Sequence, residues 1–188
     1  MASNLDESIC KVAIALGNGR WAAMTPVAMN EARAITPKEI VKLPDRWYPA
    51  ISAKKAQVPE LVDSWDHLWF EAVAEILFQC SRDGLPGLIT LMDRNECTYH
   101  QYVVVRLLRL AADGVETDLI LDRVRGRLET LRLPWSRFVV QETEAWKPVD
   151  ARPLALLMTM SGIEIPGSDG DTIAMHMRSM GPDRRAQL

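Results

Sequence analysis

Three polar side chains spaced four residues apart on one expected helix form the set in this sequence best suited to bind a metal ion. Asp63, His67 and Glu71 would share a helical face, because an α-helix turns once in about 3.6 residues. Carboxylates and imidazoles are metal ligands, and pairs at this spacing occur in helical metal sites. The second histidine that is usual for zinc is missing. The set therefore fits either a metal-dependent enzyme or a solvated His–carboxylate pair, and we predict no bound metal or cofactor.

Arginine is concentrated in one stretch of the chain. Seven members lie within it: Arg106, Arg109, Arg123, Arg125, Arg127, Arg132 and Arg137. On two neighbouring antiparallel helices such residues could form a ridge that binds phosphates, and Arg123 and Arg127 are its best candidates. Acidic residues interleave with them: Asp113, Glu116, Asp118, Asp122 and Glu129. The alternative is a salt-bridged, solvated face.

Tryptophan and arginine occur side by side in two segments that we expect to be loops. The first is Arg46-Trp47-Tyr48, and the second joins Trp135 to Arg137. Trp146 follows in a further irregular stretch. Both residue types dominate the binding energy of protein interfaces, so these residues are candidate partner anchors. The alternative is that the loop tryptophans fold back onto the core.

Two copies of a helical unit position these residues. Residues 71–92 can be laid over residues 101–122 at an offset of 30, which brings Asp83-Gly84 onto Asp113-Gly114. The pattern resembles HEAT-type helical hairpins, which stack and present binding surfaces. The resemblance implies an all-α fold of about two right-handed, stacked antiparallel hairpins. An ordinary helical domain explains the same pattern.

Hydrophobic periodicity, capping residues and breakers give the remaining elements. We expect helices over 5–16, 59–81, 99–112, 117–131 and 153–161, and a short partner helix over 86–93. Thr25-Pro26 and Thr36-Pro37 should begin two short helices in an otherwise irregular stretch, 17–57, because a hydroxyl cap before proline is a helix start signal. The expected organisation is a single all-α domain over 1–180, made of an irregular part (1–57), a hairpin core (58–133) and a C-terminal part (134–180), with a disordered tail, 181–188.

Composition narrows the function classes. The net charge is −3, which argues against a general affinity for nucleic acid or anionic membranes. Three cysteines without paired spacing fit a reducing cytoplasm, and the first residues lack the pattern of a secretory signal.

The prediction is a cytoplasmic, non-enzymatic protein that binds another protein, as an adaptor, an inhibitor or an immunity-type neutraliser. Its predicted contacts are the residues Arg46, Trp47, Tyr48, Arg123, Arg127, Trp135, Arg137 and Trp146. Nucleic-acid binding through the arginine ridge at 106–137 is the first alternative, and a metal-dependent enzyme using Asp63, His67 and Glu71 is the second.

Overall fold

The computed structural model describes residues 5–17, 21–48, 64–94, 100–127 and 146–160, and in these ranges every regular element is a helix. The predicted all-α class is therefore confirmed. The chain divides into two compact units, 1–103 and 104–188, which are described separately below. Among the described residues, no helix combines the length and the apolar character needed to cross a bilayer.

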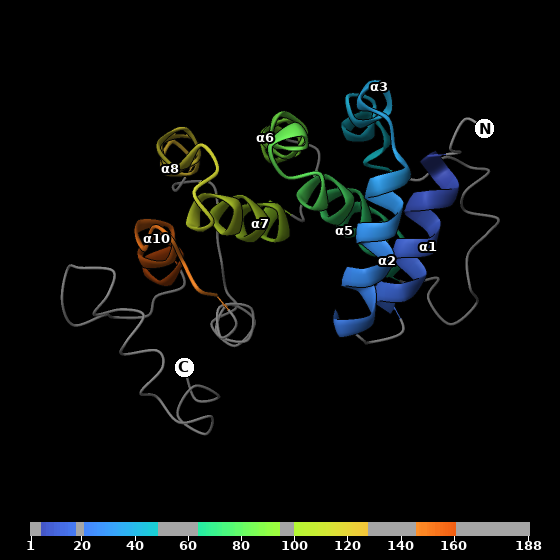
Figure 1. Ribbon diagram of the computed structural model, residues 1–188, viewed down its shortest axis with the longest axis horizontal. Helices are drawn as coiled ribbons and strands as arrows, with labels where there is room; N and C mark the ends of the chain where they lie inside the picture. The colour runs from blue at the N-terminus through green and yellow to red at the C-terminus, as the bar shows by residue number, and fades with distance from the viewer. Residues whose placement is uncertain (1–4, 18–20, 49–63, 95–99, 128–145, 161–188) are drawn as a thin grey trace. The chain divides into compact units, whose positions relative to one another are not determined.

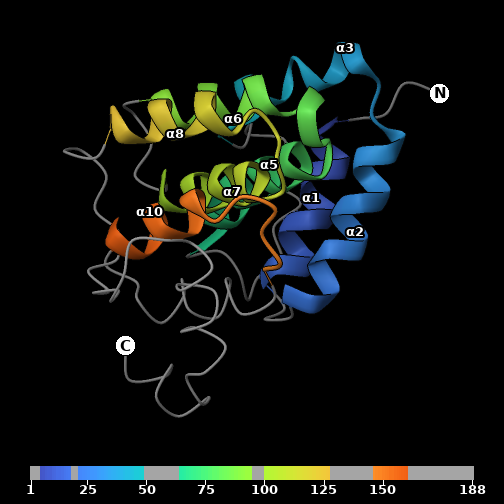
Figure 2. The same ribbon diagram turned by 60° about the vertical axis from the view of Figure 1, so that its left-hand side comes forward.

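Unit 1 is built around the helix α5 (Trp65–Gln79), which is buried along most of its length. It packs against α1 (Leu5–Gly17), α2 (Trp21–Ala34), the 3-10 helix η1 (Leu43–Arg46) and α6 (Leu85–Asp93). Figures 1 and 2 show α1 and α2 side by side, with α5 against them. Every residue from Leu68 to Leu77 is buried, the acids Glu71 and Glu75 included, so α5 is covered on nearly every side and lies at the centre of the unit.

The helix α2 corrects one prediction. Its 14 residues fall in the stretch expected to be irregular, and Pro26 lies inside it rather than at its start. A proline beyond the first turn removes a backbone hydrogen bond and crowds the carbonyl four residues earlier, at a cost of about 3 kcal/mol that other contacts of the helix must offset. The α2 residue Ala28 is fully buried, and α2 contacts both α1 and α5. Packing thus outweighs the local start signal.

The second predicted start signal is confirmed. The short helix α3 (Pro37–Ile40) begins after Thr36, and the Glu39 carboxylate accepts hydrogen bonds from both the backbone N–H and the hydroxyl of Thr36, at 2.9 and 2.7 Å. These bonds lower the pKa of Glu39. Since Ile40 and Leu43 are buried, the segment from α3 to η1 is fixed to unit 1.

In unit 2, α7 (His100–Ala112) continues from Val104, and α8 (Thr117–Arg125) and α10 (Arg152–Met160) follow. The α8 residues Ile120, Leu121 and Val124 are buried, as its periodicity indicates. The predicted extent of this helix to residue 131 is wrong, because α8 ends at Arg125 with Gly126 as its C-cap. Glycine is a poor helix former and a common residue at helix ends.

The two glycines that anchor the sequence repeat have different conformations. Gly114 is left-handed, with φ of 87°, and closes α7: its N–H donates to Ala111 O, and that of Val115 donates to Leu110 O. Gly84 has φ of −84° and follows the 3-10 helix η3 (Ser81–Asp83) into α6. The two connections therefore differ locally, and HEAT-like stacking remains a prediction.

Candidate functional site

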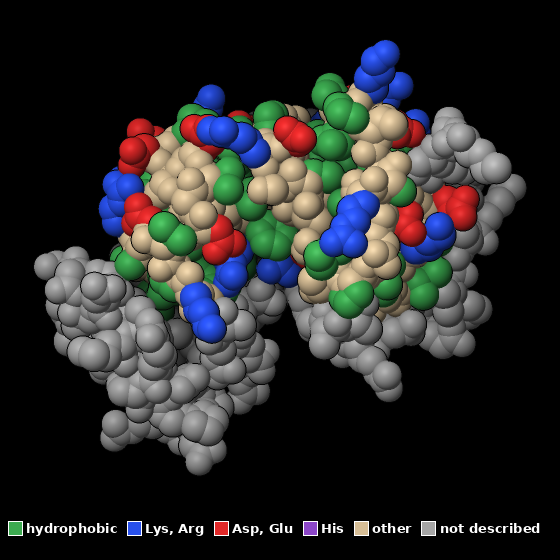
Figure 3. All heavy atoms as spheres, in the orientation of Figure 1, with side chains coloured by type: hydrophobic (Ala, Val, Ile, Leu, Met, Phe, Trp, Pro, Cys, Tyr) green, Lys and Arg blue, Asp and Glu red, His purple; other side chains and the backbone are tan. Residues whose placement is uncertain are grey.

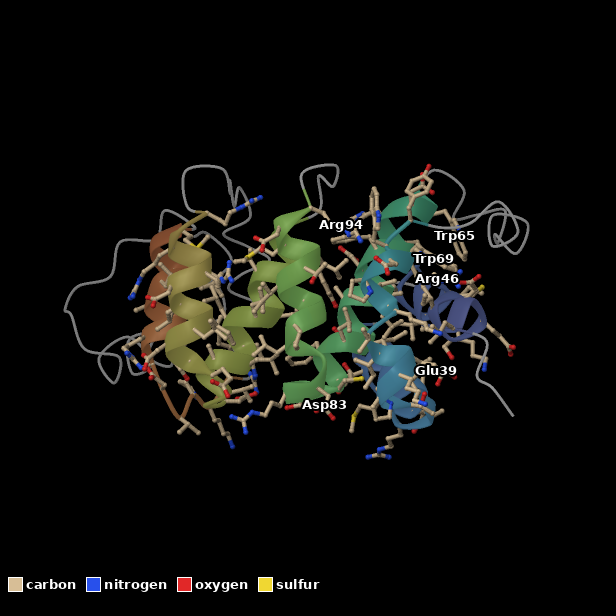
Figure 4. The ribbon with its side chains drawn as sticks, turned by 90° about the horizontal axis from the view of Figure 1, so that it is seen from above. Glu39, Arg46, Trp65, Trp69, Asp83 and Arg94 are labelled. Atoms are coloured by element: carbon tan, nitrogen blue, oxygen red, sulfur yellow. The ribbon has the colours of Figure 1, made fainter. Side chains whose placement is uncertain are left out.

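The segment Arg46-Trp47-Tyr48 lies at the end of η1 and is held against α5. Its anchor is Trp69, which is fully buried and whose indole Nε1–H donates to Arg46 O at 2.7 Å. Figure 4 shows Trp69 and Arg46 together where this segment meets α5. Because Leu43 and Pro44 are also buried, the segment has a defined backbone rather than that of a free loop.

One face of Trp47 is covered by an arginine from the end of α6. The Arg94 guanidinium carbon lies 5.7 Å from the centroid of the Trp47 ring, a cation–π distance. Arg94 Nη2 also donates to Asp45 Oδ1 at 3.0 Å, which fixes the guanidinium over the ring. Trp47 is half-buried, with this guanidinium over one face of its ring.

Tyr48 forms an aromatic pair with Trp47 on the solvent side of the segment. Its ring centroid is 5.5 Å from that of Trp47, the two planes are inclined by 57°, and Tyr48 is 49% exposed. Arg46 is exposed as well, and its Nη1 makes long contacts of 3.4 and 3.5 Å to the two carboxylate oxygens of Asp6. We call Arg46, Trp47, Tyr48 and Arg94 the η1 cluster. It combines the residue types that favour protein interfaces on a rigid support.

Trp146, the third predicted aromatic anchor, is part of the core of unit 2. It is 7% exposed, and the Arg109 guanidinium covers its ring at 5.3 Å. Residues just after it cap α7, because the N–H groups of Val149 and Asp150 both donate to Ala112 O, at 2.7 and 3.1 Å. The buried ring offers almost no surface to a partner, which agrees with the alternative interpretation of this tryptophan.

The described arginines of the predicted ridge have different environments. Arg106 is buried, and Arg109 is bonded to Asp113 at 3.1 Å besides covering Trp146. Arg123 is exposed on α8, and Arg127 is half-buried just beyond its end. These side chains do not form a uniform exposed set. Three of the predicted residues, Arg132, Trp135 and Arg137, lie outside the described residues.

A polar row follows one face of α5 and includes part of the predicted metal set. His67 Nε2 lies 2.6 Å from Glu71 Oε1, and this contact raises the pKa of His67 against the opposing effect of burial. Asp63 lies outside the described residues. Among the residues that are described, no three His, Cys, Asp or Glu side chains have an arrangement that could hold a metal ion.

Glu75, the most buried carboxylate of this row, is not among the residues predicted from the sequence. Glu75 is 1% exposed, and its two oxygens accept hydrogen bonds from Tyr102 Oη at 2.6 Å and from Gln79 Nε2 at 2.8 Å. The sequence does contain a pattern that points to Glu75. It is an acid inside the apolar run of α5, and it continues the four-residue spacing of His67 and Glu71. Because Tyr102 of α7 donates a hydrogen bond to it, Glu75 links the start of α7 to α5 and has a structural role.

Comparisons with known proteins leave the chain without an assigned family. No family model matches it, and neither the curated proteins nor the solved structures contain a significant match. Functional inference therefore rests on the residues and geometry described above.

Proposed function

We propose that this protein is a non-enzymatic protein–protein interaction module and that the η1 cluster is its partner anchor. The observation that carries the proposal is the half-exposed Tyr48 beside a Trp47 ring that Arg94 holds in place. An aromatic pair that is already ordered loses little conformational entropy when a partner covers it. Trp47, Tyr48 and Arg46 would contact the partner directly, and Trp69 would position them.

The cluster favours protein contact over the other two function classes. Arg94 and Asp45 neutralise each other at 3.0 Å, so the cluster has no strong field for phosphates. His67 and Glu71 are joined to each other at 2.6 Å, and within the described ranges no three His, Cys, Asp or Glu side chains could hold a metal ion with them. The predicted contacts Arg123, Arg127, Trp135 and Arg137 remain candidates for a second contact region.

The test is affinity capture of the tagged protein from its native lysate, with and without nuclease, read by mass spectrometry. We expect one stoichiometric protein partner that survives nuclease. Replacing Trp47 and Tyr48 together by alanine should weaken its binding by about a hundredfold or more, since interface aromatics often contribute 2 kcal/mol or more each. The matched control is Leu119→Ala on α8, a side chain that is 45% exposed and lies outside the cluster.

Two outcomes would reject the proposal. Equal capture by the double variant and the wild type would show that the η1 cluster is not the anchor. Capture that disappears with nuclease would favour the nucleic-acid alternative, and charge reversal at Arg123 and Arg127 would then be the next measurement. A thermal melt of each variant separates lost binding from lost folding.

A further inference from the structure

The short helix α3 and its flanks carry exposed cations that form no ion pair with an acid of the described residues. Arg33, Lys38 and Lys42 are exposed, and none of them makes a salt bridge within the part of the chain that the structure describes. Lys38 and Lys42 are one helical turn apart. Figure 3 shows Lys and Arg side chains gathered over α3, beside hydrophobic side chains.

The acids nearby in the sequence already have other partners. Glu31 accepts a hydrogen bond from the Ser8 hydroxyl at 2.6 Å and pairs with Lys11 at 3.3 Å. The Glu39 carboxylate accepts hydrogen bonds from Thr36, and these bonds are the main causes of its lowered pKa. The positive charge of Lys42 contributes the least to that lowering. Glu39 keeps its negative charge, but Arg33, Lys38 and Lys42 outnumber it, so residues 33–42 carry an excess of positive charge although the whole chain carries −3.

An exposed apolar residue stands between two of these cations, Lys38 and Lys42, in the chain. Val41 is 77% exposed, whereas its neighbour Ile40 is 8% exposed and Leu43 is fully buried. The buried neighbours and the Thr36–Glu39 bonds fix the backbone, so Val41 is presented on a rigid segment. We call Arg33, Lys38, Val41 and Lys42 the α3 surface.

We propose that the α3 surface binds an acidic segment of another protein that places an apolar side chain on Val41. Opposite charges across an interface steer association and fix its register, and an apolar contact at the centre supplies affinity. A nucleic acid would need a longer array of cations and would gain nothing from Val41. The α3 surface does not include Trp47 or Tyr48, so this inference stands apart from the proposed function of the η1 cluster.

The test uses a short fluorescein-labelled peptide in which leucines alternate with glutamates, followed by fluorescence anisotropy. The double variant Lys38→Glu/Lys42→Glu should bind it about tenfold more weakly or worse, because two attractions become repulsions. The control Arg125→Glu/Lys147→Glu, at two exposed cations of unit 2 outside the α3 surface, changes the net charge equally and should alter affinity about twofold at most. Val41→Ser, which keeps every charge, should weaken binding about threefold.

Four results would overturn the inference. The first two are that the wild type does not bind the acidic peptide, or that both charge-reversal variants lose affinity for it equally. The other two are that a peptide with lysine in place of glutamate binds equally well, or that phosphatidylserine vesicles or a single-stranded oligonucleotide bind more tightly than the acidic peptide. Circular dichroism melts of the charge-reversal variants check folding. The neutral double variant Lys38→Gln/Lys42→Gln gives an intermediate affinity if charge is the cause.

Discussion

Two tryptophans one turn apart on α5 have opposite hydrogen-bonding states. The rings of Trp65 and Trp69 lie 6.1 Å apart and both residues are fully buried. The indole N–H of Trp69 is bonded to Arg46 O, whereas that of Trp65 has no acceptor among the described residues. The same chemical group thus stabilises the fold at one position and carries a desolvation cost at the other.

This difference predicts unequal effects of the same substitution. Trp69→Phe should lower the free energy of unfolding by about 1–3 kcal/mol more than Trp65→Phe, because only the first leaves Arg46 O without its donor. Urea denaturation of both variants measures the difference, and the common loss of ring volume cancels in it. Equal destabilisation would show that packing alone decides both positions.

His67 predicts a pH dependence of stability. Its hydrogen bond to Glu71 raises its pKa above the ordinary value of 6.5, so the folded state holds the proton more tightly than the unfolded state does. The stabilisation is complete below pH 6.5 and is lost as the pH rises through the higher folded-state pKa. Denaturation between pH 5 and 9 should show this loss in the wild type, and His67→Gln should remove that component. An unchanged profile in the variant would contradict this assignment.

At the scale of elements, the junction between α5 and α6 depends on a close approach of two backbones. A Cβ atom added at Gly84 would lie 1.9 Å from Leu77 O, a distance that no side chain can occupy. A second glycine, Gly87, brings α6 close to the Leu77 side chain and to Pro44 of η1. Glycine at these two positions therefore lets α6 lie close to the end of α5 and to η1.

Alanine at Gly84 should therefore separate α6 from the end of α5. We expect Gly84→Ala to destabilise the protein by about 3 kcal/mol, in the range of overpacked sites. Gly126→Ala is the matched control, since its nearest contact is an ordinary 3.5 Å to Asp122 O. The control should change stability by less than about 1 kcal/mol. Thermal or urea denaturation of both variants measures the two changes in stability. A Gly84→Ala variant as stable as the wild type would show that the junction between α5 and α6 can shift to make room for the added methyl group.

For the molecule as a whole, the aromatic residues have two separate roles. Trp65, Trp69, Phe70 and Tyr102 are almost completely buried, and Trp146 is 7% exposed, whereas Tyr48 is 49% exposed. Core aromatics stabilise the folded chain, and exposed aromatics are available for recognition. This division is the basis for choosing the η1 cluster over Trp146 as an anchor.

The division predicts opposite results for two truncations. Trp146→Ala should destabilise the protein by about 3 kcal/mol or more, because it opens a cavity beneath Arg109 and removes a cation–π contact. Tyr48→Ala should change the free energy of unfolding by about 0.5 kcal/mol or less. Denaturant titrations report both values. A stable Trp146→Ala variant would return this residue to the candidate anchors.

Local patterns in the sequence determined much of the helical structure. The predicted helices over 5–16, 86–93 and 99–112 match α1, α6 and α7 closely, because apolar spacing and end signals act within a few residues. The Thr36–Glu39 cap was also readable, since all its atoms belong to four consecutive residues. The candidate pair His67–Glu71 follows from helical spacing in the same way.

Only the tertiary structure decided which of these residues are buried, paired or exposed. Helix α2 extends through Pro26 because it packs on α1 and α5, which the local signal could not reveal. Trp47 and Arg94 are 47 positions apart in the numbering, yet they stack at 5.7 Å. Trp47 and Trp146 look alike as loop tryptophans in the sequence, but one borders the surface and the other is in the core. Burial and long-range pairing depend on the packing of distant segments, so the sequence supplied the candidates and the fold separated them.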